Sequence, residues 1–532
     1  MSRYLIVGNP VVTLADEAFI TDGALIVEGK KIVESGPRAE LETKGPFDRV
    51  LGSQDHFVMP GFVASHYHSE SALGPGLWEM LFERANIYVH PVFKPMDEEI
   101  MYKAILVTLM TAVRGGITTT VDAFYGRPGP KNFGMDNALQ AYEDLGMRTA
   151  LGITLRDENL YVHEANDDFL ARLPEELAEE VRNSPMGYAL PSDDVIAAYE
   201  DAAATWDRRD DRLRVLLAPD WTPAVTDDLY RRCRAIATEY DTGIMTHCLE
   251  TRSEMQYNIR RFGVTAMQRL ADIGLLGPDV SLSHFVWATD RDIEILADTG
   301  AVAASNPGSN LRLSTGVCRV RDILDAGGGL AFGTDAISFS ERDDMFQEVR
   351  LGAYLQRLPL GPEPEYGRLN SEALLRSAAT YGARAARAED RIGSLAVGKD
   401  ADLLILDRKR VFERPARFYV SPVLDVILDR ADGTDIETVL VAGKVVLDNG
   451  EITALNEQQI RDEYNEAIAR GLFDLEEPWA RWAELAFEVE PYLFDFYRPW
   501  AEEPMALGYE YNTTTGPAGF GGGRRVGGGT GR

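Results

Sequence analysis

The organisation of the chain is best approached from one stretch, Met59-Pro-Gly-Phe-Val-Ala-Ser-His-Tyr-His-Ser-Glu70. An apolar run leads into His66 and His68, and the turn signal Pro60-Gly61 precedes it. Side chains at i and i+2 of a β-strand share one face, so the two imidazoles could bind one metal ion while Tyr67 points the other way. A His-x-His pair alone predicts a metal site only weakly. The rest of the chain must supply further ligands at strand ends.

Residues 59–390 alternate apolar strand patterns with helical ones. The expected strands are Gly61–Ser65, Ile117–Phe124, Arg148–Thr154, Arg214–Ala218, Gly243–Thr246, Val280–Ser283, Ala301–Ser305 and Leu330–Gly333. Strands alternating with helices imply parallel βαβ units, and eight of them predict an α/β fold, a (β/α)₈ TIM barrel. An insertion near 156–211 is too long for a plain loop, so we expect it to carry helices and cover the pocket mouth.

Strand-and-turn patterns flank this region on both sides. Residues 1–58 and 391–455 are expected to form one small β-sandwich, a discontinuous domain into which the barrel is inserted. Residues 456–532 form an aromatic-rich C-terminal extension that ends in a Gly-rich tail. So many aromatic side chains need a surface to cover, on their own chain or on a neighbouring subunit. We expect a homo-oligomer with the extension at an interface.

Composition restricts the class of protein. The 532 residues are 45% hydrophobic and 26% charged, with a formal net charge of −31. Such an acidic chain argues against nucleic acid as a partner, because phosphate contacts need clustered Lys and Arg. No apolar run approaches the roughly 18 residues of a membrane span, and the N-terminus lacks a signal-peptide pattern. Three cysteines without CxxC spacing favour a reducing compartment, and we expect a cytoplasmic protein.

Further candidate ligands stand where the expected strands end, which is where barrel enzymes place their chemistry. His247, His284 and Asp335 follow the fifth, sixth and eighth strands. With His66 and His68, four of the seven histidines in the chain occupy such positions. A strand-end His could instead cap a carbonyl, and Asp335 could cap a helix, but neither alternative explains the clustering of all five at one rim.

Glu250 lies three residues beyond His247, where the strand gives way to a loop. A carboxylate beside a metal-bound water can act as general base and then as general acid. The alternative is a surface Glu at the start of the next helix. For His56, His90 and His163, which match no strand end, a structural role is favoured, although His90 could line the pocket.

With these residues in place, the chain resembles the amidohydrolase superfamily, and within it the branch of chlorohydrolases and deaminases such as triazine hydrolase and guanine and cytosine deaminases. The motifs that carry the resemblance are Pro60-Gly-Phe-Val-Ala-Ser-His66-Tyr-His68, Gly115-Gly-Ile-Thr-Thr-Thr-Val-Asp122, His247-Cys-Leu-Glu250, Asn306-Pro-Gly-Ser-Asn-Leu-Arg-Leu-Ser-Thr-Gly316, Gly333-Thr-Asp335 and the stretch from Gly393 to Asp407.

The resemblance implies one divalent metal ion held by His66, His68, His247 and Asp335. It further implies that Glu250 shuttles protons and that His284 hydrogen-bonds the attacking water, so Glu250, His284 and Asp335 form the catalytic set. Zinc is the first choice of metal, and Fe²⁺, Mn²⁺ or Co²⁺ suit the same ligands. Two-metal relatives use a carboxylated lysine after the fourth strand, and Leu213-Arg-Val-Leu-Leu-Ala-Pro-Asp220 contains no lysine.

The substrate is expected to be a small molecule. Candidate substrate-binding residues are Trp78, Phe82, Tyr88, His90, Trp221 and Asn310. Where many deaminases of the branch have Pro-His-Ala-Pro-Tyr, this chain has Pro219-Asp-Trp-Thr-Pro223, which argues against a nucleoside such as S-adenosylhomocysteine.

The expected reaction is cleavage of a non-peptide C–N bond by a metal-activated hydroxide, foremost deamination of an aminated N-heterocycle. The alternatives are an amide, urea or carbamate hydrolase that releases an amine, for example from a phenylurea or an anilide, and a non-catalytic structural homologue.

Overall fold

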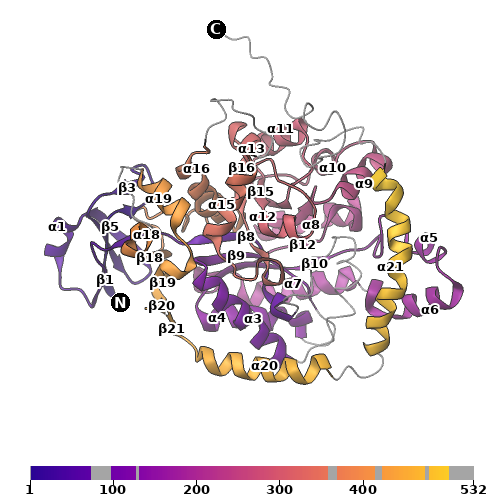
Figure 1. Cartoon of the computed structure of the whole chain (residues 1–532), viewed down its shortest axis with the longest axis horizontal. Helices are drawn as coiled ribbons and strands as arrows, with labels where there is room; N and C mark the ends of the chain where they lie inside the picture. The colour runs from indigo at the N-terminus through magenta and orange to yellow at the C-terminus, as the bar shows by residue number, and fades with distance from the viewer. Residues whose placement is uncertain are drawn as a thin grey trace, which may run out of the picture.

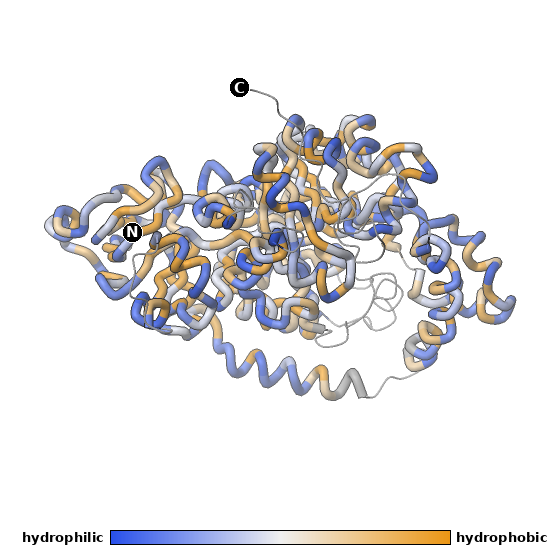
Figure 2. Tube along the Cα trace, turned by 45° about the horizontal axis from the view of Figure 1, so that its top comes forward, coloured by the Kyte–Doolittle hydropathy of each residue, from blue (hydrophilic) through white to orange (hydrophobic). Residues whose placement is uncertain are grey.

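The structure is a computed structural model, and it describes residues 2–73, 98–126, 131–187, 189–357, 368–413, 422–473 and 479–502. Figure 1 shows strands gathered in the centre with helices around them, and Figure 2 shows hydrophobic stretches of the chain running through the middle of the molecule. Within those ranges, no helix combines the length and apolar composition that crossing a bilayer would need.

Parallel strands form the centre of the molecule. Their bounds are β8 (Phe62–His68), β9 (Ile117–Phe124), β10 (Arg148–Leu155), β11 (Leu213–Val215), β12 (Ala218–Pro219), β13 (Ile244–Cys248), β14 (Val280–His284), β15 (Val302–Ser305), β16 (Gly329–Phe332) and β17 (Asp335–Ala336). One sheet has the order β11-β10-β9-β8-β17, and a second has the order β13-β14-β15-β16. Isolated parallel bridges, Leu217 to Ile244 and Trp221 to His247, join the two sheets. The α/β class and its parallel sheets therefore agree with the sequence prediction.

The sheets are buried on both faces, because helices cover their outer side. The helices between the strands include α3 (Glu98–Arg114), α4 (Met135–Leu145), α8 (Asp227–Tyr240), α9 (Arg252–Phe262), α10 (Ala266–Asp272), α11 (Asp290–Thr299), α12 (Pro307–Arg312), α13 (Val320–Asp325), α15 (Met345–Leu355) and α16 (Ser371–Arg376). Every residue of β9 is buried, as the near-continuous apolar and Thr-rich run Ile117–Phe124 predicts for a strand covered on both faces.

The fourth expected strand is split, which the sequence did not predict. Leu216 donates its N–H to the carbonyl of Leu151 at 2.8 Å, whereas Leu217 donates to the carbonyl of Gly243 at 3.1 Å. Both pieces, β11 and β12, pair with β10, and the residues between them bond alternately to β10 and to the segment that leads into β13, as in a strand flanked on both sides. Asp220 and Trp221 follow β12 at the same end of the sheet as the candidate ligands.

Two antiparallel-rich sheets lie beside the parallel ones and are built from both ends of the chain. The first, β5-β4-β1-β6, contains β1 (Arg3–Gly8), β4 (Gly23–Glu28), β5 (Lys31–Pro37) and β6 (Arg49–Gly52). The second has the order β21-β20-β19-β18-β7-β2-β3. Its strands are β2 (Val11–Val12), β3 (Phe19–Ile20), β7 (His56–Pro60), β18 (Leu403–Asp407), β19 (Ile436–Val441), β20 (Lys444–Asp448) and β21 (Glu451–Ile452). Apolar side chains of both sheets share one core, which includes Ile6, Leu25, Val58, Leu403 and Ile405.

The insertion near 156–211 carries helices, as expected: α5 (Asn166–Leu170), α6 (Glu175–Asn183) and α7 (Ser192–Trp206). The C-terminal extension contributes α20 (Glu457–Phe473), which packs against α3, and α21 (Trp479–Glu502). In Figure 1, α21 stands beside α5 and α6, on the side of the molecule opposite β1 and β5. The aromatic residues of the extension therefore cover part of their own chain.

Candidate metal centre and active site

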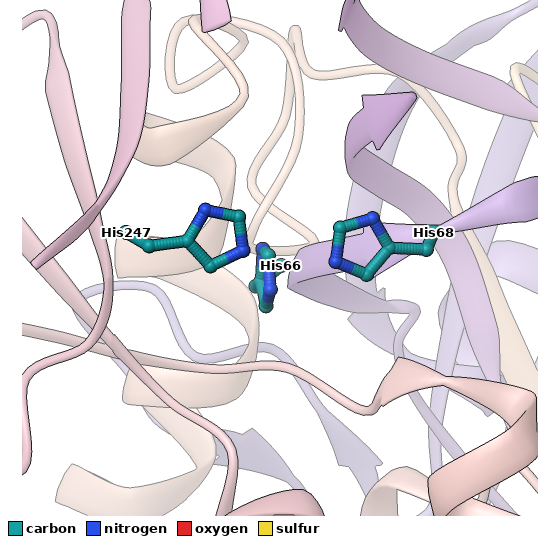
Figure 3. Close-up of side chains that lie close together, drawn as sticks. All are labelled: His66, His68 and His247. Atoms are coloured by element: carbon teal, nitrogen blue, oxygen red, sulfur yellow. The ribbon is translucent and has the colours of Figure 1, made fainter. Parts of the chain in front are cut away.

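Strand ends far apart in the sequence bring five candidate residues together. In the register of β17 and β8, Asp335 lies opposite Tyr67, and so between His66 and His68. The ring centroid of His66 lies 4.8 Å from that of His68, 4.7 Å from that of His247 and 5.0 Å from that of His284. Figure 3 shows His68 and His247 approaching from opposite sides with His66 between them. All five side chains are buried.

Hydrogen bonds at the Nδ1 atoms fix the orientation of the three clustered imidazoles. His68 Nδ1 donates to the carbonyl of Ala123 at 2.5 Å, and His247 Nδ1 donates to the carbonyl of Asp220 at 2.7 Å. His66 Nδ1 lies 2.9 Å from Ser283 Oγ. A ring whose Nδ1 carries the proton presents the Nε2 lone pair on its other side, which is the form that binds a metal ion.

Asp335 completes a set of metal-ligating atoms. Its Oδ1 lies 3.4 Å from His68 Nε2 and 3.7 Å from His66 Nε2, while its Oδ2 accepts a hydrogen bond from Ser309 Oγ at 2.6 Å. Ligand atoms of His66, His68 and His247 lie within 4.8 Å of one another, as do those of His66, His284 and Asp335. His66 Nε2 and Asp335 Oδ1 are buried and have no hydrogen-bond partner among the described residues. Such buried polar atoms are costly unless a bound group pairs with them.

Glu250 and His284 stand beside this cluster. Glu250 follows β13 and is buried rather than at the surface, with its Oε1 3.5 Å from His284 Nε2. His284 Nε2 lies 3.8 Å from Asp335 Oδ2, and His284 Nδ1 donates to Asn310 Oδ1 at 2.8 Å. Asn310, predicted to bind substrate, here orients His284.

Helix α12 holds two of these side chains at once. Ser309 contacts Asp335 and Asn310 contacts His284, and both residues lie on α12. The N–H of Gly308 in the first turn of α12 donates to Glu348 Oε2 at 2.8 Å. Glu348 is buried on α15, so it fixes the helix that positions Ser309 and Asn310. Neither Ser309 nor Glu348 was predicted from the sequence.

Glu254 is a third supporting residue that was not predicted from the sequence. Its Oε1 accepts the N–H of Leu249 at 2.7 Å, and its Oε2 accepts the N–H of Glu250 at 2.7 Å. Thr251 caps α9 by accepting the N–H of Glu254. The pattern Thr251-Arg-Ser-Glu254 has the spacing of a capping box, and this signal could have found the residue. Glu254 thereby sets the backbone from which the Glu250 side chain projects.

Comparison with known proteins assigns the family. A sequence model of the amidohydrolase family matches residues 57–446. The chain belongs to this family. It is therefore a hydrolase that acts on carbon–nitrogen bonds, as the sequence predicted.

Relatives of this amidohydrolase include deaminases. It is 28% identical to a 5'-deoxyadenosine deaminase of Methanosarcina barkeri over 85% of this chain and 94% of that protein. Its fold is similar to a zinc-bound adenosine deaminase of Xanthomonas campestris, with a TM-score of 0.75 and 24% identity over 88% of this chain and 99% of that one. It is also similar to a triazine hydrolase of Arthrobacter aurescens, with a TM-score of 0.76 and 21% identity over 88% and 100% of the two chains.

Burial lowers the pKa of three histidines at the centre of this amidohydrolase. Desolvation, followed by the neighbouring imidazoles, lowers the pKa of His66 well below its usual value. Desolvation also lowers the pKa of His68, against the opposing effect of Asp335, and lowers that of His284 to about 4. Neutral imidazoles are the form that binds a metal ion and accepts protons. His284 and Asp335 also have positive φ angles, 72° and 60°, a strained conformation typical of functional sites.

The remaining predicted residues fall in three groups. Trp78, Phe82, Tyr88 and His90 lie outside the described residues. Trp221 is buried, and its backbone pairs with His247. His56 hydrogen-bonds Ser53 and Glu437 in the flanking β region, whereas His163 lies in an aromatic cluster beside Trp221.

Tyr125 is a further neighbour of the centre that sequence reasoning did not single out. Its ring stacks on His68, with centroids 4.9 Å apart and an interplanar angle of 19°. Its backbone N–H donates to Glu70 Oε1 at 3.0 Å. Both residues follow strand ends, and this position was their only sequence signal.

Proposed function

We propose that this amidohydrolase is a hydrolytic deaminase of aminated N-heterocycles that uses one divalent metal ion, with zinc as the first choice. One observation carries the proposal. The buried atoms His66 Nε2 and Asp335 Oδ1 have no hydrogen-bond partner among the described residues, and they lie within a cluster of oriented imidazoles. The Methanosarcina barkeri relative, named as a 5'-deoxyadenosine deaminase, supports the reaction class.

The residues at this centre fit a metal ion. Three imidazole Nε2 atoms and one carboxylate oxygen form the donor set that zinc prefers in catalytic sites, and Fe²⁺, Mn²⁺ or Co²⁺ suit it as well. His66, His68, His247 and Asp335 would hold the ion. When bound, it would supply a Lewis acid that lowers the pKa of a coordinated water from about 15.7 toward 7.

Glu250 and His284 act on the protons of the reaction. Glu250, held by Glu254 through the backbone, accepts a proton from the attacking water and returns it to the leaving nitrogen, which leaves as ammonia. His284, oriented by Asn310, directs its Nε2 toward Glu250 and Asp335 and orients the water. Burial of the whole set excludes bulk water and strengthens each of these contacts.

The architecture that supports this site is, in our proposal, a (β/α)₈ barrel formed by residues 59–390. The strand pairings support closure of the barrel. They run from β8 through the first sheet, across the isolated bridges to the second sheet, and β17 pairs with β8 again. We further propose that residues 1–58 and 391–455 form a composite β-sandwich around their shared core, and that residues 456–532 are a separate extension.

The test is a substrate panel combined with elemental analysis of the purified protein. 5'-Deoxyadenosine, adenosine, guanine and an aminated triazine are assayed for ammonia, and an anilide and a phenylurea are assayed for released amine. We expect about one equivalent of a divalent metal per chain and ammonia from at least one heterocycle. Amine release without any ammonia would favour the amide or urea hydrolase instead, and a metal-free, inactive protein would favour a non-catalytic homologue.

A further inference from the structure

Helix α21 forms a second hydrophobic core together with the 156–211 insertion. Buried side chains of α21 pack against buried side chains of the insertion, separately from the main core of the protein. Its members include Leu485, Phe496 and Trp500 on α21, Phe169 and Val181 in the insertion, and Tyr257 on α9. The ion pair of Arg481 with Glu180 adds a polar link. Residues 479–502 lie beyond the stretch that matches the amidohydrolase family.

The end of α21 is tied to α9, the helix that begins directly after Glu250. Gln256 Nε2 donates to the carbonyl of Trp500 at 2.8 Å, and Arg252 Nη1 donates to the carbonyl of Ala501 at 3.1 Å. The guanidinium of Arg260 lies 4.0 Å from the centroid of the Trp500 ring, within the range of a cation–π interaction. These contacts fix the position of Trp500 relative to the catalytic loop.

His163 connects α21 to the active-site side of the sheet. Its Nδ1 lies 3.2 Å from the hydroxyl of Tyr497 and its Nε2 lies 3.2 Å from Ser253 Oγ, so both ring nitrogens are hydrogen-bonded. Rings of Tyr497 and Trp500 contact it at centroid distances of 5.3 and 5.8 Å. Desolvation lowers its pKa to about 3, so the ring is neutral at pH 7 and packs as one more aromatic group.

Trp221 carries this contact to the metal centre. Its ring centroid lies 5.0 Å from that of His163. Its backbone pairs with His247, and the carbonyl of the preceding residue, Asp220, accepts the Nδ1 proton of His247. The contacts thus run from α21 through two buried aromatic side chains, those of His163 and Trp221, and then through the backbone of Trp221 to the candidate metal ligand His247.

We propose that α21 is a specificity element: Tyr497 and Trp500 hold His163 and Trp221 as a rigid aromatic wall beside the catalytic centre, and this wall selects heterocycles with a short substituent over those with a long one. The inference rests on the proposed function and deepens it. For adenine nucleosides, the preferred compounds are those whose 5' carbon carries hydrogen, and the disfavoured ones carry an amino-acid chain there.

The selectivity follows from packing. His163 and Trp221 are buried, and His163 packs against Trp221, Tyr497 and Trp500, so they cannot move to admit more atoms without losing those contacts. Tyr497 and Trp500 touch no candidate catalytic atom, so they act as positioning residues. Loss of the Tyr497 or Trp500 side chain should allow His163 and Trp221 to move and should leave the metal-ligating residues in place.

The experiment measures binding, so that no turnover is needed. In a zinc-loaded Glu250→Gln background, calorimetric titration gives the Kd of 5'-deoxyadenosine and of S-adenosylhomocysteine. The variants are Tyr497→Phe, which removes only the hydroxyl contact to His163, Trp500→Ala, and Trp500→Phe as the conservative rescue. Phe487→Ala is the matched control, because Phe487 lies on the exposed face of α21 with 60% of its surface accessible.

We expect the background protein to prefer 5'-deoxyadenosine, and Trp500→Ala to reduce this preference about tenfold, the scale of pocket-size discrimination. Tyr497→Phe should reduce it less, and Trp500→Phe and Phe487→Ala should retain it. If both compounds bind and the Kd ratio stays constant in Tyr497→Phe and Trp500→Ala, the inference is wrong and the proposed function stands. If the background protein binds neither compound, the nucleoside class and the inference fall together.

Discussion

The substitution Glu348→Gln should increase the free energy of unfolding relative to the natural chain, and this gain should be much larger at pH 8 than at pH 5.5. Burial, opposed by the hydrogen bond from Gly308, raises the pKa of Glu348 from 4.5 to about 8. A carboxyl whose folded pKa is raised holds its proton in the folded protein and loses it on unfolding, so its contribution to stability falls as pH rises from about 4.5 to 8. Glutamine accepts the same hydrogen bond and has no proton to lose.

The magnitude follows from the shift. One pKa unit is worth about 1.4 kcal/mol, and between pH 5.5 and pH 8 the shift of Glu348 costs the natural chain on the order of 3 kcal/mol that the variant does not lose. Asp122, another buried carboxyl with a raised pKa, is present in both proteins and cancels in the comparison.

The assay is urea unfolding of both proteins at the two pH values, after refolding has been shown to be reversible. Glu294→Gln is the control, because Glu294 forms an exposed ion pair with Arg291. The difference in unfolding free energy between Glu348→Gln and the natural chain could instead be the same at both pH values. That result would show that Glu348 is ionised in the folded protein and that its pKa is not raised.

The remaining predictions concern the active site. Glu250→Gln should lower kcat by about 10²–10⁴-fold, because proton transfer is lost, while metal content measured by elemental analysis stays at the natural level. His247→Ala should lose both metal and activity, since one imidazole donor is removed, and retention of a full metal equivalent would contradict its assignment. Glu254→Ala should lower kcat more than it raises KM, because the N–H groups of Leu249 and Glu250 lose their acceptor, and equal loss in both constants would argue against positioning. Removal of metal by a chelator should abolish activity, and added Zn²⁺ should restore it; full activity in the metal-free protein would exclude the proposed chemistry.

The strand-end residues could be predicted because the carboxyl ends of parallel strands meet at one edge. His247 and Asp335 are far apart in the chain, yet each follows an apolar run that can only be a buried strand, so their meeting at His66 required no tertiary information. The bounds of α4 follow from local sequence in the same way, because Gly134 precedes it and Gly146 follows it, both in the left-handed conformation that favours glycine.

The supporting contacts could not be predicted in the same way. Ser309 reaches Asp335 and Glu348 reaches Gly308 only because α12 and α15 pack side by side, and no local pattern encodes that neighbour relation. The split of the fourth strand likewise depends on where Leu216 and Leu217 find acceptors, which the neighbouring strands decide. The sequence predicts the aromatic extension at a subunit interface, because an apolar face fits any complementary surface; that α21 packs against the insertion of its own chain is a neighbour relation no local pattern encodes.

The pairing of β7 with β18 has a consequence for synthesis on the ribosome. His56–Pro60 is translated early, whereas its antiparallel partner Leu403–Asp407 emerges only after all the parallel strands. At about 5–20 residues per second, this strand edge waits for on the order of tens of seconds. A nascent chain that displays an apolar, unpaired edge for so long is a natural client for a holding chaperone, and release before residue 407 would leave that edge open to aggregation.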